Sequence, residues 1–226
     1  MIIAIFVAAT FLVPRPASFR APDAFLNNAQ LSLAIEFISA DPIARTIILD
    51  WYPLLPGVGC TNNLSKVIDI YVDPNILDSS SPRFTSTVLP VALPDHPPVY
   101  RLNITAYCRL ETSVLLGFRT ISKLLSSDER FGFLGSASKS IENYPFDVYF
   151  ATFFVRGSDA HSGEDVKLNV THSFGQIVNF AIDLHDSGEW ANWLGYTVQL
   201  RRSSATISFV LAAAGYWLLP FSQSAT

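Results

Sequence analysis

Few side chains in this sequence are spaced as a catalytic site requires. Ser136 and Lys139 match the S-x-x-K pattern, in which a lysine helps a serine to attack an acyl group. Serine enzymes of this kind also carry a K-T-G sequence, and none follows here. The surrounding serines and glycine are typical of a flexible loop. We therefore expect a loop at this position.

The polar segment around His161 is the second candidate. With Glu164 and Asp165 this imidazole could bind a cation, but a metal site needs three or four converging ligands and no other histidine is near in the sequence. His172 and His185 are separated by a predicted strand and form no recognised pattern. We expect a solvated turn at His161, with no catalytic residue, no metal and no cofactor.

The composition excludes some classes of protein and favours others. Of the 226 residues, 50% are hydrophobic and only 15% are charged, which is less charged than a typical soluble domain. The net charge is −4 and no basic patch is apparent, so nucleic acid is not an expected partner. No phosphate-binding loop or dinucleotide fingerprint is present.

An aromatic run that starts at residue 144 is the most informative stretch. From Phe146 to Val155 both alternating faces are largely apolar, which predicts a strand covered on both sides in the middle of a β-structure. The motif that opens the run consists of Tyr144, Pro145, Phe146 and Asp147.

Asp147 is the anomaly of this run, because burying a charge without a partner is costly. One interpretation is an exposed aspartate that caps a turn at the end of the strand. The other is an ion pair with Arg201 or Arg202, which directly precede the last apolar segment.

The sequence contains two cysteines, Cys60 and Cys108. They are too few for a zinc site made of cysteines or for a disulfide scaffold. As a pair they would close a loop of about fifty residues and stabilise the fold by about 4 kcal/mol through chain entropy. The alternative is two separate buried thiols.

Three N-x-S/T sequons begin at Asn63, Asn103 and Asn169. Asn63 is predicted in a loop, and Asn103 and Asn169 on the polar faces of their strands. A glycan needs a residue that faces solvent, so we expect glycosylation of at least one of them.

Short runs with a period of two, separated by prolines and turn residues, predict about nine or ten strands at intervals typical of a sandwich. The segment 122–144 is expected to be irregular, and Asp186 to Gly188 to form a turn. The predicted strands are residues 31–37, 46–51, 67–73, 84–89, 100–108, 113–121, 146–155, 166–172, 176–184 and 196–202.

Both ends of the chain are apolar. Residues 1–14 fall short of the ~20 needed to span a bilayer, which leaves a signal peptide, a short anchor, a trimmed membrane helix or a buried helix. Residues 15–30 are expected to be a linker. Residues 203–226 carry no charge and predict a C-terminal transmembrane helix, with a buried helix of a soluble protein as the alternative.

Two sequence signals disagree about the compartment. Sequons and a disulfide indicate a lumenal or extracellular domain. The arginines at positions 15, 20, 201 and 202 all lie on the domain side of the apolar ends, which by the positive-inside bias would place the domain in the cytosol. That bias weakens for long domains, so we expect a lumenal or extracellular location.

The motif at 144–147 resembles a hallmark of a poorly characterised membrane family, domain of unknown function 4436. Leu49 to Pro53 and the arginine pair before an apolar helix are similar to that family as well. The resemblance implies an extracytoplasmic β-domain followed by several membrane helices, of which this chain would carry a shortened set. Pro145-Phe146-Asp147 is also similar to the Pro-Phe-Asp of Cys-loop receptor extracellular domains, where it lies at the junction with the membrane.

Taken together, these features predict a mainly β protein: an antiparallel β-sandwich over residues 31–202 with a C-terminal transmembrane helix and a short N-terminal apolar helix. We expect a structural, binding or signal-relay role without catalysis, in the secretory pathway or plasma membrane. The expected partners are a lipid bilayer and another membrane protein or a second copy of the chain. The alternative is a membrane-anchored hydrolase whose site is built from loops.

Overall fold

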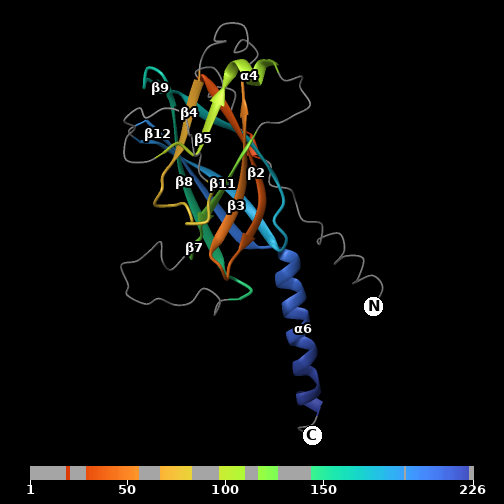
Figure 1. Ribbon diagram of the computed structural model, residues 1–226. Helices are drawn as coiled ribbons and strands as arrows, with labels where there is room; N and C mark the ends of the chain where they lie inside the picture. The colour runs from red at the N-terminus through yellow and green to blue at the C-terminus, as the bar shows by residue number, and fades with distance from the viewer. Residues whose placement is uncertain are drawn as a thin grey trace.

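Two β-sheets pack face to face, and a helix leaves one end of the sandwich (Figure 1). The computed structural model describes residues 19–20, 29–55, 67–82, 97–109, 117–126, 144–190 and 192–223. The prediction of a mainly β chain with antiparallel sheets is confirmed for these residues.

The first sheet has the strand order β1-β10-β2-β3-β6. All of its neighbours are antiparallel except β10 and β2, which run parallel, with Leu168 beside Leu31 and Gly175 beside Phe37. The strands are β1 (Phe19–Arg20), β2 (Leu31–Asp41), β3 (Thr46–Leu54), β6 (Phe118–Lys123) and β10 (Leu168–Gly175).

The second sheet has the order β11-β12-β8-β4-β5, with the short strands β7 and β9 also paired to β8. Every pair in it is antiparallel. The strands are β4 (Val67–Val72), β5 (Tyr100–Asn103), β7 (Leu125–Ser126), β8 (Val148–Asp159), β9 (Asp165–Val166), β11 (Phe180–Trp190) and β12 (Trp193–Arg202).

Strand β8 lies in the middle of its sheet, as its apolar faces predict. It pairs with β12 over its first two thirds and with β4 over its last third. One face is core, whereas the opposite face is half-buried rather than fully covered. The core residues of β8 are Tyr149, Ala151, Phe153 and Val155.

Aromatic side chains from both sheets meet in the core. Trp51 of β3 stacks on Phe118 of β6 and meets the edge of Phe153 of β8, with ring centroids 6.0 Å apart in both pairs. The indole N–H of Trp51 donates to Oγ1 of Thr120 at 2.8 Å, so the buried ring leaves no unsatisfied donor. The contact between Trp51 and Phe153 joins the two sheets.

Two segments differ from the sequence prediction. The expected strand 100–108 ends at Asn103 and continues as helix α4 (Ile104–Arg109), because the Asn103 side chain accepts a hydrogen bond from the backbone N–H of Ala106 and caps the helix. The expected turn at Asp186 to Gly188 is a bulge inside β11, where Gly188 has a φ of +86°.

The boundaries of the domain also differ from the expected ones. β1 lies within the predicted linker and pairs with β10, so the first sheet takes in residues before 31. A short strand, β7, lies in the segment expected to be irregular. The N-terminal apolar run and the expected strand 84–89 lie outside the described residues.

Helix α6 (Ser204–Gln223) follows β12 and extends away from the sandwich (Figure 1). Within the part of the chain that the structure describes, no helix combines the length and the apolar character that crossing a membrane requires.

Candidate functional site

Strands β8 and β12 bring Asp147 and Arg202 together at the base of α6. Nε of Arg202 lies 3.0 Å from both carboxylate oxygens of Asp147, and a terminal guanidinium nitrogen lies 2.9 Å from Oδ2. The side chain of Asp147 is 1% exposed and that of Arg202 is 14% exposed. Of the two candidate arginines, Arg202 is therefore the one that pairs with Asp147.

Two aromatic rings cover the guanidinium of Arg202. Its central carbon lies 4.4 Å from the ring centroid of Phe180 and 5.1 Å from that of Tyr144. A cation over an aromatic face is stabilised by roughly 0.5–2 kcal/mol, more when it is desolvated. We call Tyr144, Asp147, Phe180 and Arg202 the junction cluster.

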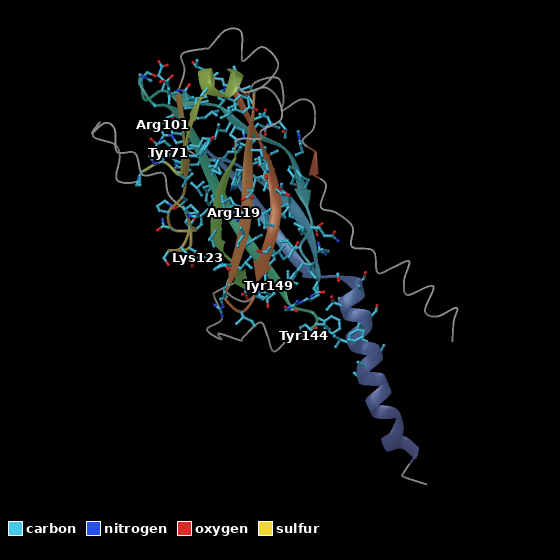
Figure 2. All side chains as sticks on the ribbon, turned by 45° about the vertical axis from the view of Figure 1, so that its right-hand side comes forward. Tyr71, Arg101, Arg119, Lys123, Tyr144 and Tyr149 are labelled. Carbon is cyan, nitrogen blue, oxygen red and sulfur yellow. The ribbon has the colours of Figure 1, made fainter. Side chains whose placement is uncertain are left out.

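The order of the strands explains how the sequence assembles this cluster. Arg202 ends β12 and is the register partner of Phe180, the first residue of β11. The preceding residue, Arg201, pairs in register with Val148 at the start of β8. Tyr144 precedes a cis peptide bond to Pro145 and lies beside the start of α6 (Figure 2).

Helix α6 begins directly at the cluster. Oγ of Ser203 accepts a hydrogen bond from the backbone N–H of Thr206 at 3.3 Å and so caps the helix. The backbone N–H of Ser203 donates to the carbonyl of Asn179 at 2.9 Å. A single residue therefore separates the last strand from the helix, and it is bonded to the β10–β11 connection.

Arg201 has a different partner. Its guanidinium donates to Asp183 of β11 at 2.6 Å, and both side chains are about half exposed. Exposed pairs of this kind contribute roughly 0–1 kcal/mol, whereas removing one partner of a buried pair costs about 3–5 kcal/mol. The base of α6 is therefore held by Arg202 far more than by Arg201.

Two further ion pairs connect neighbouring strands. Arg101 of β5 donates two hydrogen bonds to the buried Asp69 of β4, at 2.6 and 2.8 Å. Arg119 of β6 does the same to Asp50 of β3, at 2.7 Å for both bonds. Both are directly opposed cross-strand pairs, a relation that only the strand register reveals.

The second of these pairs borders a tyrosine with a shifted pKa. The hydroxyl of Tyr52 donates to Glu36 at 2.6 Å. This hydrogen bond, burial and the negative charges of Glu36 and Asp50 raise the pKa of Tyr52 from 10.0 to about 12. The tyrosine is thus fixed as a donor on the outer surface of the first sheet.

The three sequon asparagines have different surroundings. Asn103 is exposed at the end of β5. The predicted exposure of Asn169 is wrong: it is 8% exposed, and its Oδ1 accepts a hydrogen bond from the hydroxyl of the buried Tyr196 at 3.2 Å. The reason is that β10 lies inside its sheet, between β1 and β2, and is buried on both faces where it begins. Asn63 lies outside the described residues.

Cys108 lies on α4 rather than on a strand, and it is disulfide-bonded. The only other cysteine of the sequence is Cys60, which lies outside the described residues. The pairing of these two positions stays a prediction.

The residues considered for catalysis do not converge where they are described. His161 is exposed in the loop after β8, and its Nδ1 is 4.0 Å from Asp159. Asp165 pairs with Arg156, and Glu164 is exposed beside it. No group of three or more His, Cys, Asp or Glu side chains among the described residues could hold a metal ion. Ser136 and Lys139 lie outside those residues.

The fold and the junction cluster define a β-sandwich domain in which an ion pair joins the start of the central strand to the end of the last strand, directly before a following helix. The chain matches the model of a family described as a domain of unknown function (DUF8687) over residues 14–200, and it belongs to that family. An uncharacterised domain was expected, but the matching model is not that of domain of unknown function 4436. No curated protein and no solved structure matches, so the likeness to Cys-loop receptors gains no support.

Proposed function

We propose that this protein is a membrane-tethered β-sandwich displayed outside the cytosol, with a structural, binding or signal-relay role and no catalysis. The observation that carries the proposal is the buried Asp147–Arg202 pair. It joins the start of the central strand to the end of β12, from which a helix without a single charged residue extends.

The apolar surface of α6 supports a lipid partner. Phe209 is 74% exposed, and Leu211 is exposed as well. Each square ångström of apolar surface left in water costs about 25 cal/mol, so an uncharged helix with such side chains gains free energy by entering lipid. The sequence places Tyr216 and Trp217 further along, where an interfacial position would suit them.

The opposite end of the domain supports an extracytoplasmic location. Cys108 is disulfide-bonded, and disulfides persist mainly in oxidising compartments. The exposed sequon residue Asn103 lies at the end of β5, far from α6 (Figure 1). A glycan there would project away from the membrane.

A relay role follows from the length of β8. Its residues 148–159 run from the junction cluster to the far end, a distance of roughly 35–40 Å at the usual rise of a strand. A partner bound at the far end would therefore be connected to α6 through one continuous strand. In the Cys-loop-like version of this proposal, the Asp147–Arg202 pair passes movement between domain and membrane.

Membrane fractions of a secretory host test the proposal. The full chain should pellet with membranes and resist alkaline carbonate, whereas a chain truncated after Arg202 should be released. Treatment with an endoglycosidase should increase the gel mobility of the full chain. A full chain that stays in the supernatant would refute the tether. A full chain that pellets with membranes but is released by carbonate would be only peripherally associated with them.

A further inference from the structure

Large apolar side chains are exposed at one end of the sandwich. Outside α6, the exposed large hydrophobics of the described residues are Ile43, Leu125, Tyr144, Phe146, Phe174 and Val178. All but Phe174 lie at the end of the domain from which α6 leaves. We call Ile43, Leu125, Tyr144, Phe146 and Val178 the apolar rim.

Backbone contacts establish that these residues share one end. The carbonyl of Arg45, in the β2–β3 turn that carries Ile43, accepts a hydrogen bond from the N–H of Leu124 at 2.8 Å. The next residue, Leu125, pairs in register with Phe150 near the start of β8. The β2–β3 turn therefore lies beside the segment that contains Tyr144 and Phe146.

The remaining member of the rim, Val178, lies next to the residue that is hydrogen-bonded to the start of α6. Val178 directly precedes Asn179, whose carbonyl accepts the N–H of Ser203. Figure 1 shows the β2–β3 turn and the start of β8 at the same end as the base of α6, and Figure 2 shows Tyr144 beside that helix. The rim thus gathers three connections around the base of one helix.

The exposure of the rim is large, and none of the described residues at the far end is an exposed large hydrophobic. Ile43 is 84% exposed and Val178 is 75% exposed. At the far end, the exposed loop after β8 carries His161, Ser162 and Glu164 instead. Apolar side chains at loop tips, grouped at one end, mark an interaction surface rather than scattered exposure.

We propose that the apolar rim rests in the headgroup layer of the lipid bilayer that α6 enters. The inference rests on the proposed function, because α6 brings that bilayer to the rim. Continuity favours lipid over a protein partner, because α6 begins at the end of the domain that carries the rim and exposes Phe209 and Leu211 in its N-terminal half. Tyr144 and Phe146 also supply the aromatic side chains that favour a membrane interface.

The rim would set the orientation of the domain. A domain joined to lipid by one helix can tilt and rotate about that helix, whereas apolar contacts on several sides of it hold the strands upright. The long axis of β8 would then lie close to the membrane normal, and the far end would stand away from the lipid.

Spin-label accessibility in phosphatidylcholine vesicles tests this inference with the full chain. Single substitutions Ile43→Cys, Phe146→Cys and Val178→Cys carry a nitroxide at the rim, and Ser162→Cys carries it at the far end as the matched control. Flotation of each labelled protein with the vesicles is measured first. Relaxation by molecular oxygen, which concentrates in lipid, is then compared with relaxation by a water-soluble nickel chelate.

The expected result is that the rim labels lose their collisions with the nickel chelate and keep those with oxygen, while the label at 162 remains accessible to the chelate. Rim labels that are open to the chelate in protein that floats would overturn the rim inference and leave the tether intact. Protection from both reagents would indicate contact with protein, a second copy included, and would also overturn it. Failure of every protein to float would refute the tether and the rim together.

Discussion

The guanidinium of Arg202 holds both carboxylate oxygens of Asp147 at 3.0 Å in a place where neither side chain has substantial contact with water. The two residues are far apart in the sequence and close only because β8 and β12 are neighbours. Mutating this pair therefore tests the pairing of β8 with β12 as well as the junction with α6.

Exchanging the two charges of this pair tests whether the ion pair itself stabilises the fold. Asp147→Arg or Arg202→Asp alone should each lower the free energy of unfolding by at least about 3–5 kcal/mol, because the remaining buried charge loses its partner and faces a like charge. The double variant should recover a large part of that loss in urea unfolding. Arg201→Asp is the matched control and should change stability by about 1 kcal/mol or less, since its partner Asp183 is exposed. A double variant no more stable than the singles would contradict the pairing.

The raised pKa of Tyr52 predicts a stability change at alkaline pH. The folded protein holds the phenol proton more tightly than the unfolded chain, so this contribution is complete below pH 10 and is lost as the pH rises towards about 12. The tyrosine Cζ signal that disappears in Tyr52→Phe should titrate near pH 12, and Glu36→Gln should move it towards 10. A Tyr52 signal that titrates at 10 in the unmodified protein would rule out the hydrogen bond to Glu36.

Glycan occupancy should distinguish the two described sequons. In a secretory host, Asn103→Gln should remove a glycan from the folded protein, whereas Asn169→Gln should leave the mass of attached glycan unchanged. A glycan on Asn169 could not fit beside Tyr196 between the sheets. Mass spectrometry of glycopeptides from monomeric protein gives the occupancy, and a glycan found on Asn169 in that fraction would contradict the placement of β10.

The disulfide of Cys108 should connect to Cys60. Digestion without reduction should yield one linked peptide that contains both cysteines, and reduction should split it. Cys108→Ala should lower the free energy of unfolding by about 4 kcal/mol if the closed loop stabilises through chain entropy. Disulfide-linked dimers on a non-reducing gel would instead indicate a bond between two chains.

The alternation of apolar residues predicted most strands and placed β8 at the centre, because a strand buried in a sandwich repeats with a period of two. It failed where a short run fits two periods. Ile104 and Cys108 are four residues apart, so they share one face of a strand and also one face of a helix, and the cap that Asn103 supplies selects the helix. Asp-Ser-Gly at 186–188 is likewise compatible with a turn or with a bulge.

For the junction cluster, the sequence indicated Asp147 and two arginines but not which arginine binds it. That choice depends on the strand register, which places Arg202 opposite Phe180 and leaves Arg201 near Asp183. Phe180 carried no signal of its own, since an aromatic residue at the start of a strand is more often core than a cover for a cation. Asn169 looked exposed because its polar neighbours suggested an outer face, whereas β10 is enclosed by partners that come from distant segments.

The parallel pairing of β10 with β2 has a consequence for synthesis of the chain. β2 cannot gain this neighbour until Gly175 has left the ribosome, and β8 cannot gain β12 until residue 201 has done so. Pairings this remote in sequence make folding slow and expose open strand edges while translation continues. The growing chain would therefore depend on chaperones until nearly the whole domain has emerged, and nonsense mutations before β12 should yield aggregation rather than a smaller folded product.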